Sequence, residues 1–153
     1  MKHLTDKRSS TSVLLMLNVA QKHGITQLQC LENTGITEEM LVDASLEIHP
    51  DQELKLIKNL QYLQPHESFA VEIGCHYPLA TYGILGFAIS TSPTVRSAVE
   101  VALNYLPLTF AFCTFAMREE SKLGYMKVDA SQVPQDIRRF VVERDMAAML
   151  CMY

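Results

Sequence analysis

The chain has 153 residues, of which 48% are hydrophobic and 20% are charged. This length and composition predict one globular domain and exclude a fibrous or largely disordered protein. The net charge of −4 argues against DNA binding by these residues themselves, because a DNA-binding face needs basic side chains against the phosphates.

Neither a signal peptide nor a membrane-spanning helix is predicted. The N-terminal residues are polar, the apolar run 13–17 is short, and no apolar stretch reaches the roughly 18 residues that a spanning helix needs. The cysteines Cys30, Cys75, Cys113 and Cys151 form no CxxC pair. We therefore expect a cytoplasmic protein with free thiols and no membrane partner.

The first part of the chain predicts a tail followed by short helices. Residues 1–11 are polar and are expected to form a disordered N-terminal tail. Ser12 can cap a helix that Gly24 ends. Thr26 and Thr37 each follow a Gly-Ile pair, and each threonine is expected to open a short helix by accepting a hydrogen bond from a free amide of its first turn.

Two further helices are predicted before the middle of the chain. Pro50 suits the first turn of a helix, and the apolar residues of Leu54–Leu63 recur with helical spacing. Residues 67–76 predict another helix, which Pro78 ends because proline cannot continue a helix from its interior.

The stretch Tyr77–Leu106 is expected to be the packing centre of the domain. Gly83 and Gly86 lie in its apolar run, where glycine allows another backbone to approach closely. Residues 90–93 read STSP, a stop signal, and Thr94 is a good cap for the next helix. We predict two apolar helices that meet at this corner, with Val95 on the inner face of the second.

The pattern changes after Pro107. Residues 108–117 are rich in aromatic and β-prone types, residues 123–130 alternate, and a polar turn over 119–122 joins them. This arrangement predicts a β-hairpin, and Pro134 opens a last helix. The predicted fold class is α+β: a mostly helical domain with a β-hairpin and a C-terminal packing helix.

No catalytic residue, metal site or cofactor is expected, and the chain is not predicted to be an enzyme. The histidines lack metal-ligand spacing. The serines near the central corner have a simpler role as backbone caps. The pair Gly83 and Gly86 lacks the lysine and the third glycine of phosphate-binding loops.

Six residues are candidates for binding a small molecule between segment 77–90 and one face of the hairpin. Aromatic residues at this junction can supply apolar walls with polar tips. Arg144 falls on the inward side of the last helix, where it needs an acid, either from this chain or from a ligand. The candidates are Tyr77, Tyr82, Phe87, Phe112, Tyr125 and Arg144.

Three separated segments resemble one family of bacterial proteins. They are GITEEMLVDASLEIHPDQELKLIKNL (35–60), YGILGFAISTSPTVRSAVEVALNYL (82–106) and VPQDIRRFVVERDMAAML (133–150). In this order they resemble the N-terminal effector-binding domain, of the arabinose-binding type, of AraC-type transcription regulators. The resemblance covers residues 15–150, nearly the whole chain.

The resemblance implies that residues 12–153 form a regulatory domain that senses a small-molecule effector, whose class differs across the family. A DNA-binding helix-turn-helix module would follow it. We expect that module to be absent from this truncated chain, so that DNA is a partner only through the missing part. The alternative is a dimerisation or interaction module without a ligand, and a homodimer is compatible with both readings.

Overall fold

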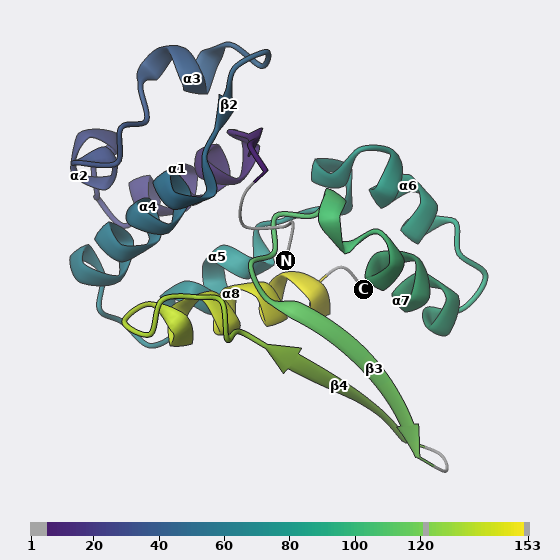
Figure 1. The fold of residues 1–153 in the computed structure, drawn as a ribbon. Coiled ribbons are helices and arrows are strands. Elements are labelled where there is room, and N and C mark those ends of the chain that lie inside the picture. The colour runs from purple at the N-terminus through teal and green to yellow at the C-terminus, as the bar shows by residue number, and fades with distance from the viewer. Residues whose placement is uncertain (1–5, 121–122, 152–153) are drawn as a thin grey trace.

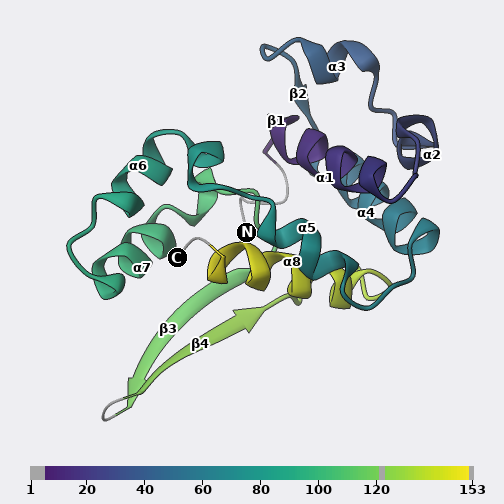
Figure 2. The ribbon, with the colours of Figure 1, turned by 180° about the vertical axis from the view of Figure 1, so that it is seen from behind.

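A computed structural model of the chain describes residues 6–120 and 123–151 (Figures 1 and 2). Helices dominate the described part, and its strands form two small antiparallel pairs. The predicted α+β class, with a hairpin and a closing helix, is confirmed. The elements are β1 (Arg8–Ser9), α1 (Thr11–Lys22), α2 (Gln27–Leu31), α3 (Glu38–Val42), β2 (Glu47–Ile48), α4 (Pro50–Leu63), α5 (Phe69–Cys75), η1 (Leu79–Tyr82), α6 (Ile84–Ser90), α7 (Val95–Asn104), η2 (Leu106–Leu108), β3 (Thr114–Glu120), β4 (Leu123–Asp129) and α8 (Arg138–Leu150).

Local capping signals place the short helices as expected. The hydroxyl of Thr26 accepts a hydrogen bond from the Gln29 amide at 3.3 Å, and that of Thr37 accepts one from the Met40 amide at 3.4 Å. Gly24, just after α1, has a φ of 77°, a conformation that glycine adopts without steric cost. These predicted helix boundaries are confirmed.

The N-terminal region differs from its prediction. Arg8–Ser9 pair with Glu47–Ile48 as a small antiparallel ladder, and α1 begins at Thr11. The expected tail is therefore structured from Arg8 onward, while residues 1–5 lie outside the described part. Ser12 is not a cap: it lies inside α1 and is completely buried, and Ser10 occupies the cap position.

The packing centre is the pair of helices α5 and α8, not the stretch 77–106. Gly74 of α5 faces the backbone of α8 at Arg144 so closely that a Cβ atom there would overlap it. Phe69 and Ile73 of α5 are almost completely buried beside it. The apolar faces of α1 and α4 complete this core, since their side chains belong to the same buried cluster.

Helices α6 and α7 form a separate lobe at one side of the molecule (Figure 1). The predicted corner exists: Thr94 accepts a hydrogen bond from the Ser97 amide at 3.1 Å and so caps α7. Gly86 of α6 lies directly against the backbone of Leu79, a close approach that only glycine permits. The prediction for Val95 is wrong, because its side chain is 66% exposed.

The predicted hairpin is confirmed, with Thr114 opposite Asp129 and Glu120 opposite Leu123. It extends away from the helices (Figure 2). Its first strand starts at Thr114, later than expected, because residues 106–108 form a helical turn and the amides of Phe112 and Cys113 donate to Asp145 instead of to a neighbouring strand. Glu119 and Glu120 of the predicted turn belong to β3, and residues 121–122 lie outside the described part.

Two of the four cysteines are paired, which corrects the expectation of free thiols. Cys75 at the end of α5 forms a disulfide with Cys151 just after α8, with their Cα atoms 5.3 Å apart. The bond joins positions 76 residues apart in the sequence and ties together the ends of the two central helices. Cys30 and Cys113 are buried and unpaired.

No helix in the described ranges combines the length and the apolar character needed to cross a membrane.

Candidate functional site

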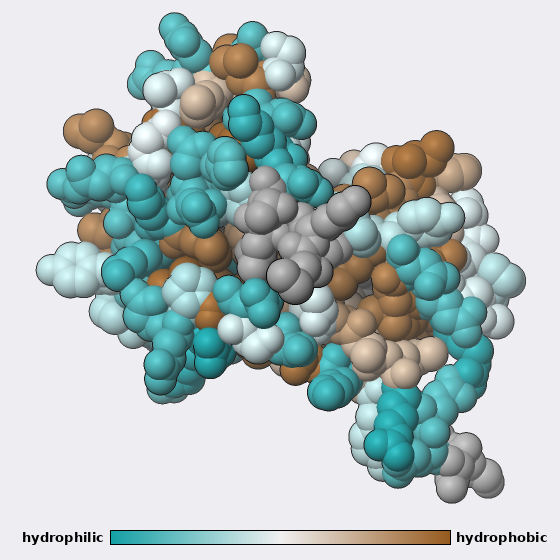
Figure 3. Space-filling model, in the orientation of Figure 1, coloured by the Kyte–Doolittle hydropathy of each residue, from teal (hydrophilic) through white to brown (hydrophobic). Residues whose placement is uncertain are grey.

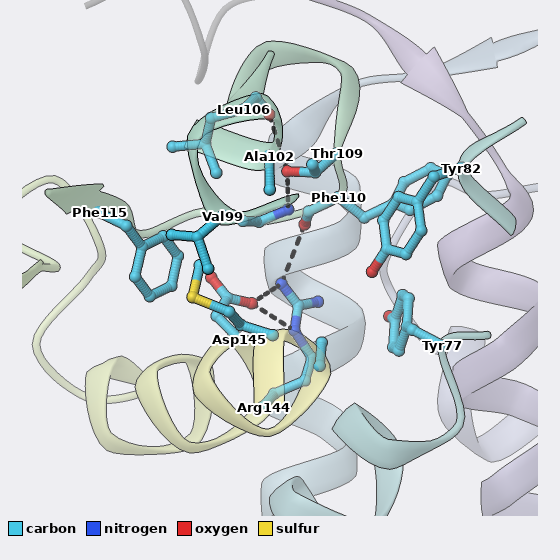
Figure 4. A pocket seen from close by; sticks show the side chains of 13 residues that line it. Tyr77, Tyr82, Val99, Ala102, Leu106, Thr109, Phe110, Phe115, Arg144 and Asp145 are labelled. Atoms are coloured by element: carbon cyan, nitrogen blue, oxygen red, sulfur yellow. Dashed lines mark hydrogen bonds and ion pairs between the residues drawn. The ribbon is translucent and has the colours of Figure 1, made fainter. Parts of the chain in front are cut away.

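A small apolar cavity lies where the α6–α7 lobe meets α8 (Figure 4). Its volume is about 40 Å³, room for roughly three water molecules. Helix α7, the segment that follows it, and α8 contribute most of the walls. The lining residues are Tyr77, Tyr82, Val99, Ala102, Leu106, Thr109, Phe110, Ala111, Phe115, Arg144, Asp145, Ala148 and Met149.

The structure brings together three of the six candidate residues. Tyr77, Tyr82 and Arg144 line the cavity. Phe112 is buried beside them, with its ring centroid 5.3 Å from the guanidinium carbon of Arg144, but it is not a lining residue.

The other two candidates lie elsewhere. Phe87 on α6 is 68% exposed and Tyr125 on β4 is 49% exposed, and neither lines the cavity. Of the hairpin residues that the structure describes, Phe115 alone lines the cavity, so the cavity opposite the tyrosines is enclosed by α7 and α8 more than by the hairpin. Phe115 and Met117 of β3 share one half-buried face with Met126 and Val128 of β4, whereas Tyr125 lies on the exposed face. The alternating pattern did not show which of the two faces meets the body of the domain.

Arg144 is almost completely buried, and its guanidinium is fully engaged by protein groups. It donates from Nε and Nη2 to Oδ1 of Asp145 at 2.9 and 2.6 Å. It also donates to Oε1 of Glu53 at 3.2 Å and to the Phe110 carbonyl at 3.1 Å. Burial alone would lower the pKa of Arg144, but Asp145, Tyr77 and Glu53 raise it above its usual value.

Asp145 uses its second oxygen to hold the segment that leads into the hairpin. Its Oδ2 accepts hydrogen bonds from the amides of Phe112 and Cys113, at 2.8 and 2.9 Å. Because Oδ1 pairs with Arg144, one carboxylate joins α8 to the start of β3. The buried negative charge of Asp145 is therefore compensated at both of its oxygens.

Glu53 brings the N-terminal strand into the same cluster. It is completely buried in α4, and its Oε2 lies 3.7 Å from Nη1 of Arg8. Arg8 also donates to the Phe110 carbonyl at 3.3 Å. The two arginines and two carboxylates, Arg8, Arg144, Glu53 and Asp145, form a buried charge cluster whose formal charges cancel.

Tyr77 connects the cavity to this cluster. Its hydroxyl lies 2.7 Å from the hydroxyl of Ser12, which donates to Oε1 of Glu53 at 2.6 Å. The single proton of Ser12 is used on Glu53, so Tyr77 is the donor in the first bond. Burial raises the pKa of Tyr77 to about 12, which keeps this donor protonated at neutral pH.

Tyr82 supplies the cavity's available polar tip. Its side chain is only 8% exposed, and its hydroxyl has no hydrogen bond to any other described residue. Figure 4 shows this hydroxyl directed toward the space beside Tyr77 and Arg144. Burial also raises the pKa of Tyr82, so the group is a neutral donor and acceptor.

Sequence reasoning missed Glu53, Asp145 and Arg8. Neither Glu53 nor Asp145 was singled out from the sequence, and Arg8 fell within the expected N-terminal tail. The spacing of Arg144 relative to Ile137 and Phe140 was the available signal, because an inward arginine requires buried acids. Nothing in the sequence indicates which acids those are.

In residues 6–120 and 123–151, no three or more His, Cys, Asp or Glu side chains gather in a way that could hold a metal ion.

Comparison with known proteins gives a consistent result. The model of a family described as the arabinose-binding domain of AraC transcription regulators, N-terminal, matches residues 24–153. Uncharacterized HTH-type transcriptional regulators of Mycobacterium bovis and Mycobacterium tuberculosis are each 26% identical over 137 residues, which is 89% of this chain and 40% of each relative. The chain therefore spans well under half the length of these relatives. No solved structure matches it.

Proposed function

This chain belongs to the family of N-terminal arabinose-binding domains of AraC transcription regulators, and we propose that it senses a small-molecule effector in the cavity lined by Tyr77 and Tyr82. The observation that carries the proposal is that an apolar cavity with polar tips directly adjoins the buried charge cluster. Small-molecule sites have this character, since apolar walls bind and a few polar groups orient.

In this proposal, helix α8 transmits the effect of ligand binding from the cavity. Four lining residues, Arg144, Asp145, Ala148 and Met149, belong to this helix. An effector that fits one arrangement of α8 and the α6–α7 lobe better than another shifts the equilibrium between them. In the full-length regulator, this shift would change DNA binding by an attached helix-turn-helix module in the cytoplasm, which is allosteric coupling between two sites.

Dimerisation is the second candidate function. It is favoured by exposed apolar side chains on the α6–α7 lobe. Ile84, Phe87 and Val95 are 83%, 68% and 66% exposed. Figure 3 shows hydrophobic surface gathered on the side of the molecule where α6 and α7 lie. Surfaces of this kind are typical of interaction sites, and dimerisation and effector sensing are compatible.

Two variants separate these functions. Ala102 lines the cavity and is 8% exposed, so Ala102→Leu fills the space while leaving the outer face of the lobe intact. Phe87→Arg changes that outer face and leaves the cavity intact. A thermal-shift screen against a metabolite library should yield ligands that stabilise the wild type and Phe87→Arg, but not Ala102→Leu.

Light scattering on the same proteins tests the alternative. If Phe87→Arg lowers the oligomeric state and no metabolite stabilises the wild type, the domain is an interaction module and the sensor proposal fails. A ligand that stabilises wild type and Ala102→Leu equally would show that the effector binds elsewhere.

A further inference from the structure

We propose that the cavity takes an uncharged, mainly apolar ligand that carries one hydrogen-bonding group, such as a hydroxyl or carbonyl, which pairs with the hydroxyl of Tyr82. This inference rests on the proposed function, because it names the chemical class of the effector for that same site. The proposed ligand class also differs from arabinose, the sugar after which the family is described.

An anionic ligand lacks a partner in the cavity. Among the described residues that line the cavity, Arg144 is the one cation, and its donors already serve Asp145, Glu53 and a backbone carbonyl. A ligand carboxylate could reach Arg144 only by displacing one of these carboxylates. The displaced group would remain buried without its partner, which is strongly unfavourable.

A cationic ligand meets the same difficulty with the opposite sign. Asp145 is the one acid in the part of the lining that the structure describes. Both of its oxygens are occupied, Oδ1 by Arg144 and Oδ2 by the amides of Phe112 and Cys113. Because the formal charges of the cluster cancel, it carries no net charge that would attract a ligand of either sign.

A polyhydroxylated ligand such as a sugar also fits poorly. The walls include Val99, Ala102, Leu106 and Met149, which cannot satisfy hydroxyl groups, and a buried hydroxyl without a partner is costly. Tyr82 offers one hydroxyl without a hydrogen-bond partner among the described residues. One polar group on an apolar ligand therefore matches the cavity.

The experiment uses small probes that differ in charge but share one chain: 1-propanol, propionate and propylamine, whose size suits a cavity of about 40 Å³, with L-arabinose as the sugar. The protein is labelled with [methyl-13C]methionine, and Met149, which lines the cavity, reports binding by its methyl resonance. Met146 lies on the same helix, is 39% exposed and does not line the cavity, so it reports non-specific effects. The resonances are assigned with Met→Leu variants.

We expect a saturable shift of Met149 but not of Met146 with 1-propanol. Binding of propionate and propylamine should be at least ~10-fold weaker, because each buries an unpaired charge, and L-arabinose should leave Met149 unchanged. Tyr82→Phe should weaken 1-propanol binding by about three- to tenfold, the effect of one hydrogen bond. Tyr125→Phe, an exposed tyrosine outside the cavity, should leave the affinity unchanged.

The remaining outcomes distinguish the two proposals. If propionate, propylamine or L-arabinose saturates the Met149 shift as tightly as 1-propanol, or if Tyr82→Phe leaves 1-propanol binding unaltered, the ligand class is wrong while the cavity remains the effector site. If no probe shifts Met149 saturably, the cavity does not accept ligands and both the ligand class and the proposed function are overturned.

Discussion

The hydroxyl of Tyr77 lies 2.7 Å from the hydroxyl of Ser12, so a residue that lines the cavity is joined directly to the completely buried face of α1. Ser12 passes this connection on to Glu53 at 2.6 Å. A ligand that moved the Tyr77 ring would therefore disturb the buried charge cluster through two hydrogen bonds. This relay gives the cavity a physical link to the centre of the domain.

Tyr77→Phe should lower the free energy of unfolding by about 1 kcal/mol, the net contribution of a typical hydrogen bond. The ring stays in place, so the change removes the donor to Ser12 without leaving a large cavity. Urea denaturation measures the effect. Tyr125→Phe is the control, because this tyrosine is exposed and its change should stay within about 0.5 kcal/mol. Equal stability of both variants would show that the relay does not stabilise the fold.

The wild type and Tyr77→Phe should also differ in how their free energy of unfolding depends on pH. Burial raises the pKa of Tyr77 to about 12, whereas an unfolded tyrosine titrates near pH ~10. Between these values only the unfolded chain releases this proton, so stability falls with rising pH by up to ~1.4 kcal/mol per unit. Tyr77→Phe lacks this loss. Its deficit relative to wild type, fully present below pH ~10, should shrink at higher pH in urea titrations; a constant deficit would contradict the raised pKa.

Arg144→Met should destabilise the domain by about 3–5 kcal/mol, because it leaves Asp145 buried without its cation and Glu53 with Arg8 alone. The matched control is Arg139→Met on the same helix. The ion pair of Arg139 with Glu143 is at the surface, with the arginine side chain 71% exposed, so solvent screens it and its loss should change the stability much less. Chemical denaturation of both variants checks the difference; similar losses would argue against a structural role of the cluster.

Gly86→Ala should destabilise the lobe by about 1–3 kcal/mol, the usual range for overpacking. Helix propensity alone predicts that the substitution stabilises the protein, since alanine is favoured over glycine in a helix. The added methyl group would overlap the backbone of Leu79, which cannot move aside as a flexible side chain could. Gly124→Ala is the control, with no atom near its added Cβ. Thermal unfolding that shows Gly86→Ala to be stabilised would contradict the close contact.

Cys75→Ser should lower the stability of the oxidised protein by about 2–4 kcal/mol, because the disulfide restricts the unfolded chain over a 76-residue separation. Alkylation of the denatured protein without reductant should label Cys30 and Cys113 only, as mass spectrometry can verify. In dithiothreitol, which reduces the disulfide, the wild type should lose most of the stability by which it exceeds Cys75→Ser. Four labelled cysteines in the unreduced protein would exclude the bond.

The elements that the sequence predicted best are those with a local cause. Thr26, Thr37 and Thr94 cap helices through amides three residues away, and Pro50 begins α4. The hairpin followed from alternation and a polar link. In each case the deciding interaction lies within a few residues of chain, where a pattern can be recognised.

The candidate site was predictable only in part. Tyr77, Tyr82 and Arg144 were identified because aromatic and inward basic residues restrict where a chain can place them. Phe87 resembled them by composition, yet α6 turns its ring to the surface. Whether a helix face is exposed depends on which elements pack against it, and those elements come from distant parts of the sequence.

The sequence by itself determined the helices, the hairpin, the membership of a regulator family and the need for an acid near Arg144. Only the tertiary structure decided that this acid is both Glu53 and Asp145, that Cys75 meets Cys151, and that α5 and α8 form the centre. The reason is physical: capping and periodicity act over neighbouring residues, whereas charge pairing, disulfide formation and close helix packing join residues that only the folded chain brings within bonding distance.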